Sequence, residues 1–171
     1  MAGPEPRLTH VDEAGAARMV DVSGKDVTVR TATATGRVLV SPQVVALLRE
    51  GAVPKGDALA VARIAGIQAA KRTPDLVPLC HPIAIHGVDV HLAVADDAVH
   101  VSATVRTADR TGVEMEALTC VAVAGLTLVD MVKAVDRAAT ITDVRVEHKS
   151  GGRSGDWRRG SGSPVEPSAA P

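Results

Sequence analysis

The sequence has almost no aromatic side chains: among its 171 residues Phe and Tyr are absent, and Trp157 is the single tryptophan. Proteins that bind single-stranded nucleic acid without sequence preference stack the bases on aromatic rings, and this chain lacks such rings. The net charge of −1 also lacks the basic surplus that is typical of nucleic-acid binding. The sequence therefore predicts no nucleic-acid partner and a core built from Val, Ala, Leu and Ile.

Cysteine and long apolar runs are also scarce. Two cysteines, Cys80 and Cys120, are too few for a disulfide framework and indicate a reducing compartment. No run reaches the roughly 18 continuous apolar residues of a membrane span, and residues 1–10 lack the apolar region of a signal peptide. We therefore expect a cytoplasmic protein without a membrane partner.

Both ends of the chain have little apolar surface to bury. Residues 1–7 and the tail 158–171 are rich in Pro, Gly and Ser, so we expect both to be disordered. The intervening residues 8–157 contain no internal repeat and have the length of one domain. The sequence thus predicts a single domain between two disordered ends.

Four segments alternate with the period of a strand. Residues 27–40 alternate around Gly36, which favours a half-buried strand that is bulged or bent at the glycine. Residues 87–94 and 98–107 alternate on either side of an Asp-Asp pair and predict a β-hairpin. Residues 141–149 alternate once more and predict a final strand.

Two short helices and a loop lie between the first strand and the hairpin. Ser41 precedes a first-turn proline and Gly51 follows the last helical residue, so a helix is predicted over 42–50. Asp57 caps a second helix, predicted over 58–72. Residues 74–82 contain three prolines, and we expect a stiffened loop without helix.

A long apolar helix with charged ends follows the hairpin, in the stretch 112–137. The order of elements is then β-α-α-β-β-α-β. With one extra helix this is the split βαβ arrangement of ferredoxin-like α/β (α+β) folds, an antiparallel sheet covered by helices on one face. The sequence therefore predicts this fold class for the domain.

Acidic and basic side chains cluster at the two ends of the long helix. Glu114 and Glu116 lie at its start, and Asp130 and Lys133 lie near its end. Carboxylates at a helix start suit the helix dipole, so ordinary helix electrostatics explains Glu114 equally well. Asp130 and Lys133 are neighbours at i,i+3 spacing and form either a plain salt bridge or an acid–base couple. Lys55 precedes the second helix, where the dipole disfavours a cation, so we expect an outside partner for it.

The two clusters are too far apart for one small substrate. Glu116 and Asp130 are separated by fourteen residues, or roughly 21 Å of helix. Either the two clusters have different roles, or a second copy of the helix packs antiparallel and brings one chain's start to the other chain's end. We expect an oligomer with shared sites.

Together with the remaining ionisable residues in loops and turns, these clusters indicate a pocket for a polyanion with a hydrogen-bonding head group. Paired carboxylates suit the N–H edge of a guanine-like ring, and lysines suit a triphosphate. The glycine-rich loop 149–157 carries Lys149 and Arg153 and is suited to wrapping an anion. No standard metal-binding spacing, phosphate-binding loop or dinucleotide motif occurs, so we expect no metal site.

Four long segments closely resemble the MoaC family, the cyclic pyranopterin monophosphate synthases of molybdenum cofactor biosynthesis. They are LTHVDEAGAARMVDVSGKDVTVR, KGDALAVARIAGIQAAKRTPDLVPLCHP, TGVEMEALTCVAVAGLTLVDMVKAVD and KSGGRSGDW, in the family's order. The resemblance covers residues 8–157. It implies a ferredoxin-like fold and a homohexamer, built as a trimer of dimers with sites at the dimer interface. Departures from the pattern are the proline before Lys55, Thr73-Pro74 and the added tail.

The resemblance also implies which residues act. By motif, the catalytic residues are Asp130, Lys133 and Lys55. The substrate-binding residues are Leu79, Cys80, His81, Glu114, Met115 and Glu116, with Lys25, Arg30, Lys71 and Lys149 as further cations.

The implied reaction is that of a phosphorus–oxygen lyase. It converts (8S)-3′,8-cyclo-7,8-dihydroguanosine 5′-triphosphate, a GTP-derived small molecule, into cyclic pyranopterin monophosphate and diphosphate. No cofactor is required of the protein, and Mg²⁺ with the triphosphate is left open. The rival hypothesis is a non-catalytic oligomeric module that binds a nucleotide and transmits a signal. It explains the fold and the cations but leaves Asp130 beside Lys133 without a role.

Overall fold

The computed structural model describes residues 11–12, 14–153 and 155–160. In this part of the chain one antiparallel sheet has five strands in the order β2-β3-β1-β4-β5. The strands are β1 Thr28–Leu39, β2 Ile85–Val94, β3 Ala98–Asp109, β4 Thr140–Ser150 and β5 Trp157–Arg158. The four segments that alternate in the sequence form β1 to β4, and the predicted hairpin is confirmed as β2–β3.

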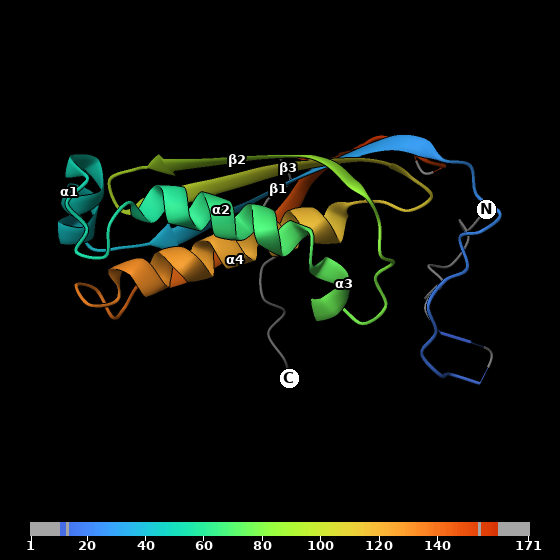
Figure 1. Ribbon diagram of the computed structural model, residues 1–171, viewed down its shortest axis with the longest axis horizontal. Helices are drawn as coiled ribbons and strands as arrows, with labels where there is room; N and C mark the ends of the chain where they lie inside the picture. Colours follow the sequence, from blue (N-terminus) through green and yellow to red (C-terminus); the bar gives the residue numbers. More distant parts are fainter. Residues whose placement is uncertain (1–10, 13, 154, 161–171) are drawn as a thin grey trace, which may run out of the picture.

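The helices lie mainly on one face of this sheet. They are α1 Pro42–Glu50, α2 Ala58–Ala70, α3 Thr73–Leu76 and α4 Glu114–Val132. Figure 1 shows α2 and α4 side by side beneath the sheet, with α1 at one end of the molecule and α3 towards the other. The predicted α+β class and the ferredoxin-like order of the main elements are therefore confirmed.

Local sequence signals set the limits of α1 and α2 as expected. The Ser41 side chain accepts a hydrogen bond from the Val44 amide, and Gly51 adopts the left-handed conformation, with φ of 66°, that ends α1. The Asp57 carboxylate accepts a hydrogen bond from the Ala60 amide at the start of α2. These caps fix where the chain enters and leaves the helical layer.

The core is made of small aliphatic side chains between the sheet and α4. Ala32, Ala34 and Val38 of β1 and Val121 and Leu128 of α4 are almost completely buried. Gly36 lies under α4, where an added Cβ would come within 2.8 Å of the Val121 Cγ1 atom. The pairing of β1 with β4 shifts by one residue beside Gly36, but the extra residue lies on β4. Strand β1 pairs with β3 without a shift through Gly36, so the bulge is on the neighbouring strand and not at the glycine.

Several boundaries differ from those expected. The loop 74–82 begins with helix α3, because a proline in the first turn of a helix loses no hydrogen bond. Helix α2 ends at Ala70 and not at Arg72. The expectation of a disordered tail from Arg158 onward is wrong for its first residues, because β5 pairs with β4 and the Arg159 amide donates to the Glu147 carbonyl. Residues 1–7 and 161–171 lie outside the described residues.

Helix α4 is apolar and long enough to cross a membrane by length and composition alone. Half of its most apolar window is buried inside the structure, where it contacts α2 and the sheet. A buried core helix can have the same length and apolar composition as a membrane span, so the contacts of α4 with α2 and the sheet account for its apolar sequence.

Two glycines in the helical layer give a matched test of this packing. A Cβ at Gly66 of α2 would come within 2.9 Å of the Cys120 carbonyl oxygen, whereas a Cβ at Gly125 of α4 would make ordinary contacts of 3.4 Å. We expect Gly66→Ala to lower the free energy of unfolding by about 1–3 kcal/mol, because backbone atoms would have to move. Gly125→Ala should leave it unchanged or raise it by about 0.5–1 kcal/mol through helix propensity. Denaturant unfolding measures both, and equal effects would show that the helices are not in close contact at Gly66.

Candidate active site

Three sequence-predicted residues meet at the C-terminal end of α4. The Lys133 Nζ atom lies 2.6 Å from Asp130 Oδ1, and the Lys55 Nζ atom lies 3.0 Å from Asp130 Oδ2. Lys55 also donates to the Asp130 backbone carbonyl at 2.8 Å. The Lys55 ammonium therefore lies at the C-terminal, negative end of the α4 dipole. This contact explains why a lysine is found just before α2, where the dipole of α2 disfavours a cation.

The carboxylate of Asp130 is held between two ammonium groups. The hydrogen bond from Lys133, and then that from Lys55, lowers the pKa of Asp130 below its usual value. All three side chains are about half exposed, so they are open to a ligand. The arrangement can hold lysine nitrogens at a fixed place and exchange protons there.

A second group of predicted residues lines a cavity of about 520 Å³ at the other end of α4. Its walls include Leu79, Cys80, His81, Met115 and Glu116. The His81 Nε2 atom lies 2.7 Å from the Val20 carbonyl oxygen, which fixes the ring against the segment before β1. The loop after α3 and the first turn of α4 thus build one pocket, as the motifs implied.

Glu116 is the buried acid of this cavity, with 3% of its surface exposed. Burial raises the pKa of Glu116 to about 7. A hydrogen bond from its own backbone amide lowers the pKa in part, and the charge of Glu114 raises it slightly. Burial and the charge of Glu116 also raise the pKa of the Cys80 thiol. The pocket therefore holds a carboxyl group that changes protonation near neutral pH.

Unlike the buried Glu116, Glu114 forms an ion pair with a lysine. Its Oε1 atom lies 3.4 Å from the Nζ atom of Lys149 on β4. Both side chains are largely covered, with 26% and 28% of their surface exposed. The predicted cation of the glycine-rich loop thus faces the start of α4.

A neighbouring cavity of about 540 Å³ is lined by cations, among them Lys25, Arg30 and Arg153. Lys25 and Arg153 also line the cavity of Glu116, so the two cavities adjoin. Gly152, with φ of 74°, lies so close to the Arg30 guanidinium that a Cβ would collide with it. Within the described residues, the Thr28 hydroxyl of this cavity is the buried side-chain polar atom without a hydrogen-bond partner.

Sequence reasoning found most of these groups and missed some. Lys71 follows the last residue of α2, is exposed, and lines neither of the two cavities. Val20 and Thr28 were not expected in the site. The segment around Val20 has no periodic pattern, and the alternation of residues 27–40 predicts that Thr28 lies in a strand but not that it lines a site. Across the described ranges, no group of three or more His, Cys, Asp or Glu side chains is close enough together to hold a metal ion.

Comparison with known proteins gives strong matches over most of the chain. The sequence model of the MoaC family matches residues 19–152. A cyclic pyranopterin monophosphate synthase of Streptomyces coelicolor is 75% identical over 156 residues, which cover 91% of this chain and 92% of that protein. One from a Nocardioides species is 70% identical over 162 residues, covering 93% and 99%. Cyclic pyranopterin monophosphate synthase 2 of Mycobacterium tuberculosis is 61% identical over 152 residues, covering 89% and 91%.

The raised pKa of Glu116 makes stability depend on pH. Between 4.5 and about 7 the folded protein keeps a proton that the unfolded chain releases. The stability that this proton contributes is fully present below pH 4.5 and is lost as the pH rises through about 7. We expect Glu116→Gln to gain roughly 3 kcal/mol relative to wild type between about pH 4 and pH 8. Thermal unfolding of both proteins across this range measures the gain, and a constant difference in melting temperature would contradict it.

Proposed function

The chain belongs to the MoaC family, and from this premise we propose that it acts as a cyclic pyranopterin monophosphate synthase in molybdenum cofactor biosynthesis. The observation that carries the proposal is the Lys55–Asp130–Lys133 cluster, which a nucleotide-binding module without catalysis does not need. The substrate is (8S)-3′,8-cyclo-7,8-dihydroguanosine 5′-triphosphate. The products are cyclic pyranopterin monophosphate and diphosphate, which makes the enzyme a phosphorus–oxygen lyase.

The chemistry consists of proton transfers and charge neutralisation. The purine rearranges to a pterin-type ring, and a sugar hydroxyl forms a bond to the α-phosphorus while the bond to the β-phosphate oxygen breaks. Lys133 and Lys55 exchange protons at the rearranging carbons and oxygens, and Asp130 fixes their ammonium groups. Positive charge around the phosphates stabilises the diphosphate that leaves.

The other end of α4 holds the substrate. Glu114 and Glu116 accept hydrogen bonds from the ring edge, and His81 and Met115 contact the substrate beside them. The phosphates belong in the adjoining cationic cavity. The cations for them are Lys25, Arg30 and Arg153, which line this cavity. Lys149 and Lys71 are further cations for the substrate that do not line it.

The two ends of α4 serve one reaction only if two chains share a site. An apolar surface on the outside of the helical layer supports this pairing: Val61 and Ile64 of α2 are 42% and 57% exposed, and Leu126 of α4 is 60% exposed. A two-fold axis through this surface sets the start of one α4 beside the end of the other. We propose a homohexamer, a trimer of such dimers.

The remaining properties follow from the substrate. The lyase needs no cofactor of its own, and any Mg²⁺ in the site would be bound by the triphosphate of the substrate. The chain is a cytoplasmic enzyme whose partner is a small molecule and further copies of itself, with no nucleic acid and no membrane among its ligands.

The direct test is turnover of the purified protein. Incubation with the cyclised GTP derivative should release one diphosphate for each pterin chromophore formed. Binding of the intermediate without release of diphosphate would favour the regulatory module instead.

Lys133 gives a test of proton transfer at the end of α4. We expect Lys133→Ala to abolish turnover while fold and assembly persist, because the side chain is half exposed and packs against little. Lys133→Arg keeps the positive charge beside Asp130 but cannot give up a proton at working pH, so it should be equally inactive. Steady-state rates measure both variants. Activity of Lys133→Ala above about 1% of wild type would argue against proton transfer by this lysine.

Mixing two inactive variants tests the shared site. Because roughly 21 Å of helix separates the two residues, Glu116→Ala and Asp130→Ala remove groups that come from different chains in each site. In a mixed dimer one site carries both changes and the other carries neither. Random reassortment should therefore restore up to about a quarter of wild-type activity. If mass measurement verifies exchange and the mixture stays inactive, the shared-site proposal is wrong.

A further inference from the structure

Strand β4 does not alternate regularly along its length. Val146 lies opposite Ala34 of β1 and His148 lies opposite Thr33, so one step on β1 is matched by two residues on β4. The extra residue is Glu147, and the irregularity is a β-bulge. Another shift lies nearer the start of β4, where Asp143 has a φ of 55°.

The bulge at Glu147 decides which face of the sheet carries Lys149. Lys149 lies directly opposite Ala32, which is completely buried on the helical face. It therefore projects towards α4, where it meets Glu114. With regular pairing beyond Val146, His148 would lie opposite Ala32 and Lys149 would turn to the open face, because a shift of one residue exchanges the faces.

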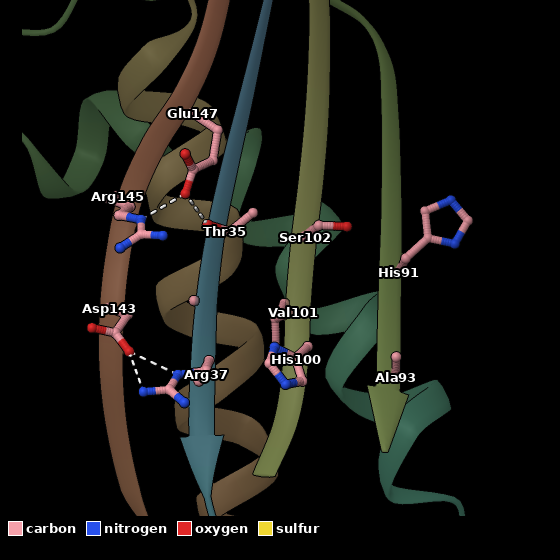
Figure 2. A pocket seen from close by; sticks show the side chains of 11 residues that line it. Thr35, Arg37, His91, Ala93, His100, Val101, Ser102, Asp143, Arg145 and Glu147 are labelled. Carbon is pink, nitrogen blue, oxygen red and sulfur yellow. Dashed lines mark hydrogen bonds and ion pairs between the residues drawn. The ribbon is translucent and has the colours of Figure 1, made fainter. Parts of the chain in front are cut away.

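The side chain of Glu147 is held from three directions on the open face. Thr35 donates to its Oε1 atom at 2.8 Å, and Arg145 Nε donates to the same atom at 2.6 Å. Arg159 Nε lies 3.7 Å from its Oε2 atom. Figure 2 shows the contacts from Thr35 and Arg145, with Glu147 on the face of the sheet opposite the helices.

The segment after β5 holds the backbone of the same bulge. The Arg159 amide donates to the Glu147 carbonyl at 2.8 Å, and its guanidinium donates to the Val146 carbonyl at 2.9 Å. The same guanidinium stacks over the Trp157 ring, 5.6 Å from its centre, and Trp157 lies opposite Lys149. Both carbonyls of the bulge are therefore bonded to one arginine.

We propose that Glu147 is a positioning residue, whose anchored bulge aims Lys149 at the substrate site on the far face of the sheet. The inference rests on the proposed role of Lys149 in binding the substrate. Glu147 touches no substrate itself, and its effect passes through the register of β4. Regular alternation is the default of a strand, so the contacts of Thr35, Arg145 and Arg159 are what keep the extra residue out of the ladder.

The first test compares two substitutions at the bulge. Glu147→Ala removes the side-chain contacts, and we expect its KM for the cyclised GTP derivative to rise about tenfold, the loss of one charge-assisted hydrogen bond, while kcat is unchanged. Glu147→Gln keeps an acceptor for Thr35 and Arg145 and should have a KM near that of wild type. An alanine variant with unchanged KM and an unchanged β4 register, or a glutamine variant as impaired as alanine, would overturn the proposal.

Deletion of Glu147 separates register from charge. Without the extra residue, regular pairing places His148 opposite Thr33 and Lys149 opposite Ala32, as in the wild type. The deletion should therefore bind substrate better than Glu147→Ala although it lacks the same carboxylate. If the folded deletion variant is as impaired as Glu147→Ala, the carboxylate acts by its charge and not through the register, and the proposal fails. A deletion more impaired than Glu147→Ala would overturn the register argument as well.

Crystal structures of Glu147→Ala and Glu147→Gln give a readout that does not depend on turnover. We expect His148 opposite Ala32 in the alanine variant and Lys149 opposite Ala32 in the glutamine variant. Lys149 opposite Ala32 in both would overturn the positioning role. A slipped register in Glu147→Ala with substrate binding unchanged would uphold the control of register by Glu147 and instead contradict the part assigned to Lys149 in the proposed function.

Discussion

The close contact of α2 with α4 is the constraint on which the site depends. Gly66 and the small residues around it allow the backbone of α2 to approach Cys120, and no aromatic side chain holds the two helices apart. At this spacing the residue that precedes α2 by a short turn, Lys55, reaches the last turn of α4. A core of Ala, Val and Gly in place of aromatic residues thus lets the helices pack closely and brings the charged groups at their ends within hydrogen-bond distance.

The two ends of α4 place their acids in opposite environments. Asp130 is exposed and held between two ammonium groups, so it stays ionised. Glu116 is buried in the wall of a cavity, and burial raises its pKa to about 7, so it changes protonation near neutral pH. One helix therefore presents a fixed charge at its end and a titrating hydrogen-bonding group at its start. In the proposed site shared by two chains, the start of one α4 would meet the polar ring of a ligand and the end of the other α4 its reacting centre.

Much of the fold could be predicted from the sequence because its signals are local. The caps Ser41 and Asp57, the hairpin and the apolar α4 each follow from a few neighbouring residues. In the segment ITDVRVEHKS, in contrast, a bulge breaks the alternation. Arg159 holds this bulge although it is 13 residues away from Val146 in the sequence, so no local signal predicts it. Helix α3 escaped prediction because Pro74 favours both a loop and a first helical turn. Val20 lies in a segment without any pattern, and the alternation around Thr28 predicts a strand but no ligand contact, so only tertiary structure could place the two residues at the site.

The position of Trp157 makes this protein its own optical probe. It is the single aromatic residue of the chain, it is 43% exposed, and it lies on β5 opposite Lys149 with the Arg159 guanidinium over its ring. Intrinsic fluorescence therefore arises from this corner of the sheet, with no tyrosine background. An emission change reports the pairing of β5 with β4 and is silent about the aliphatic core. Fluorescence and circular dichroism accordingly follow different parts of the same molecule, and a mismatch between their transitions measures how independently the last strand detaches.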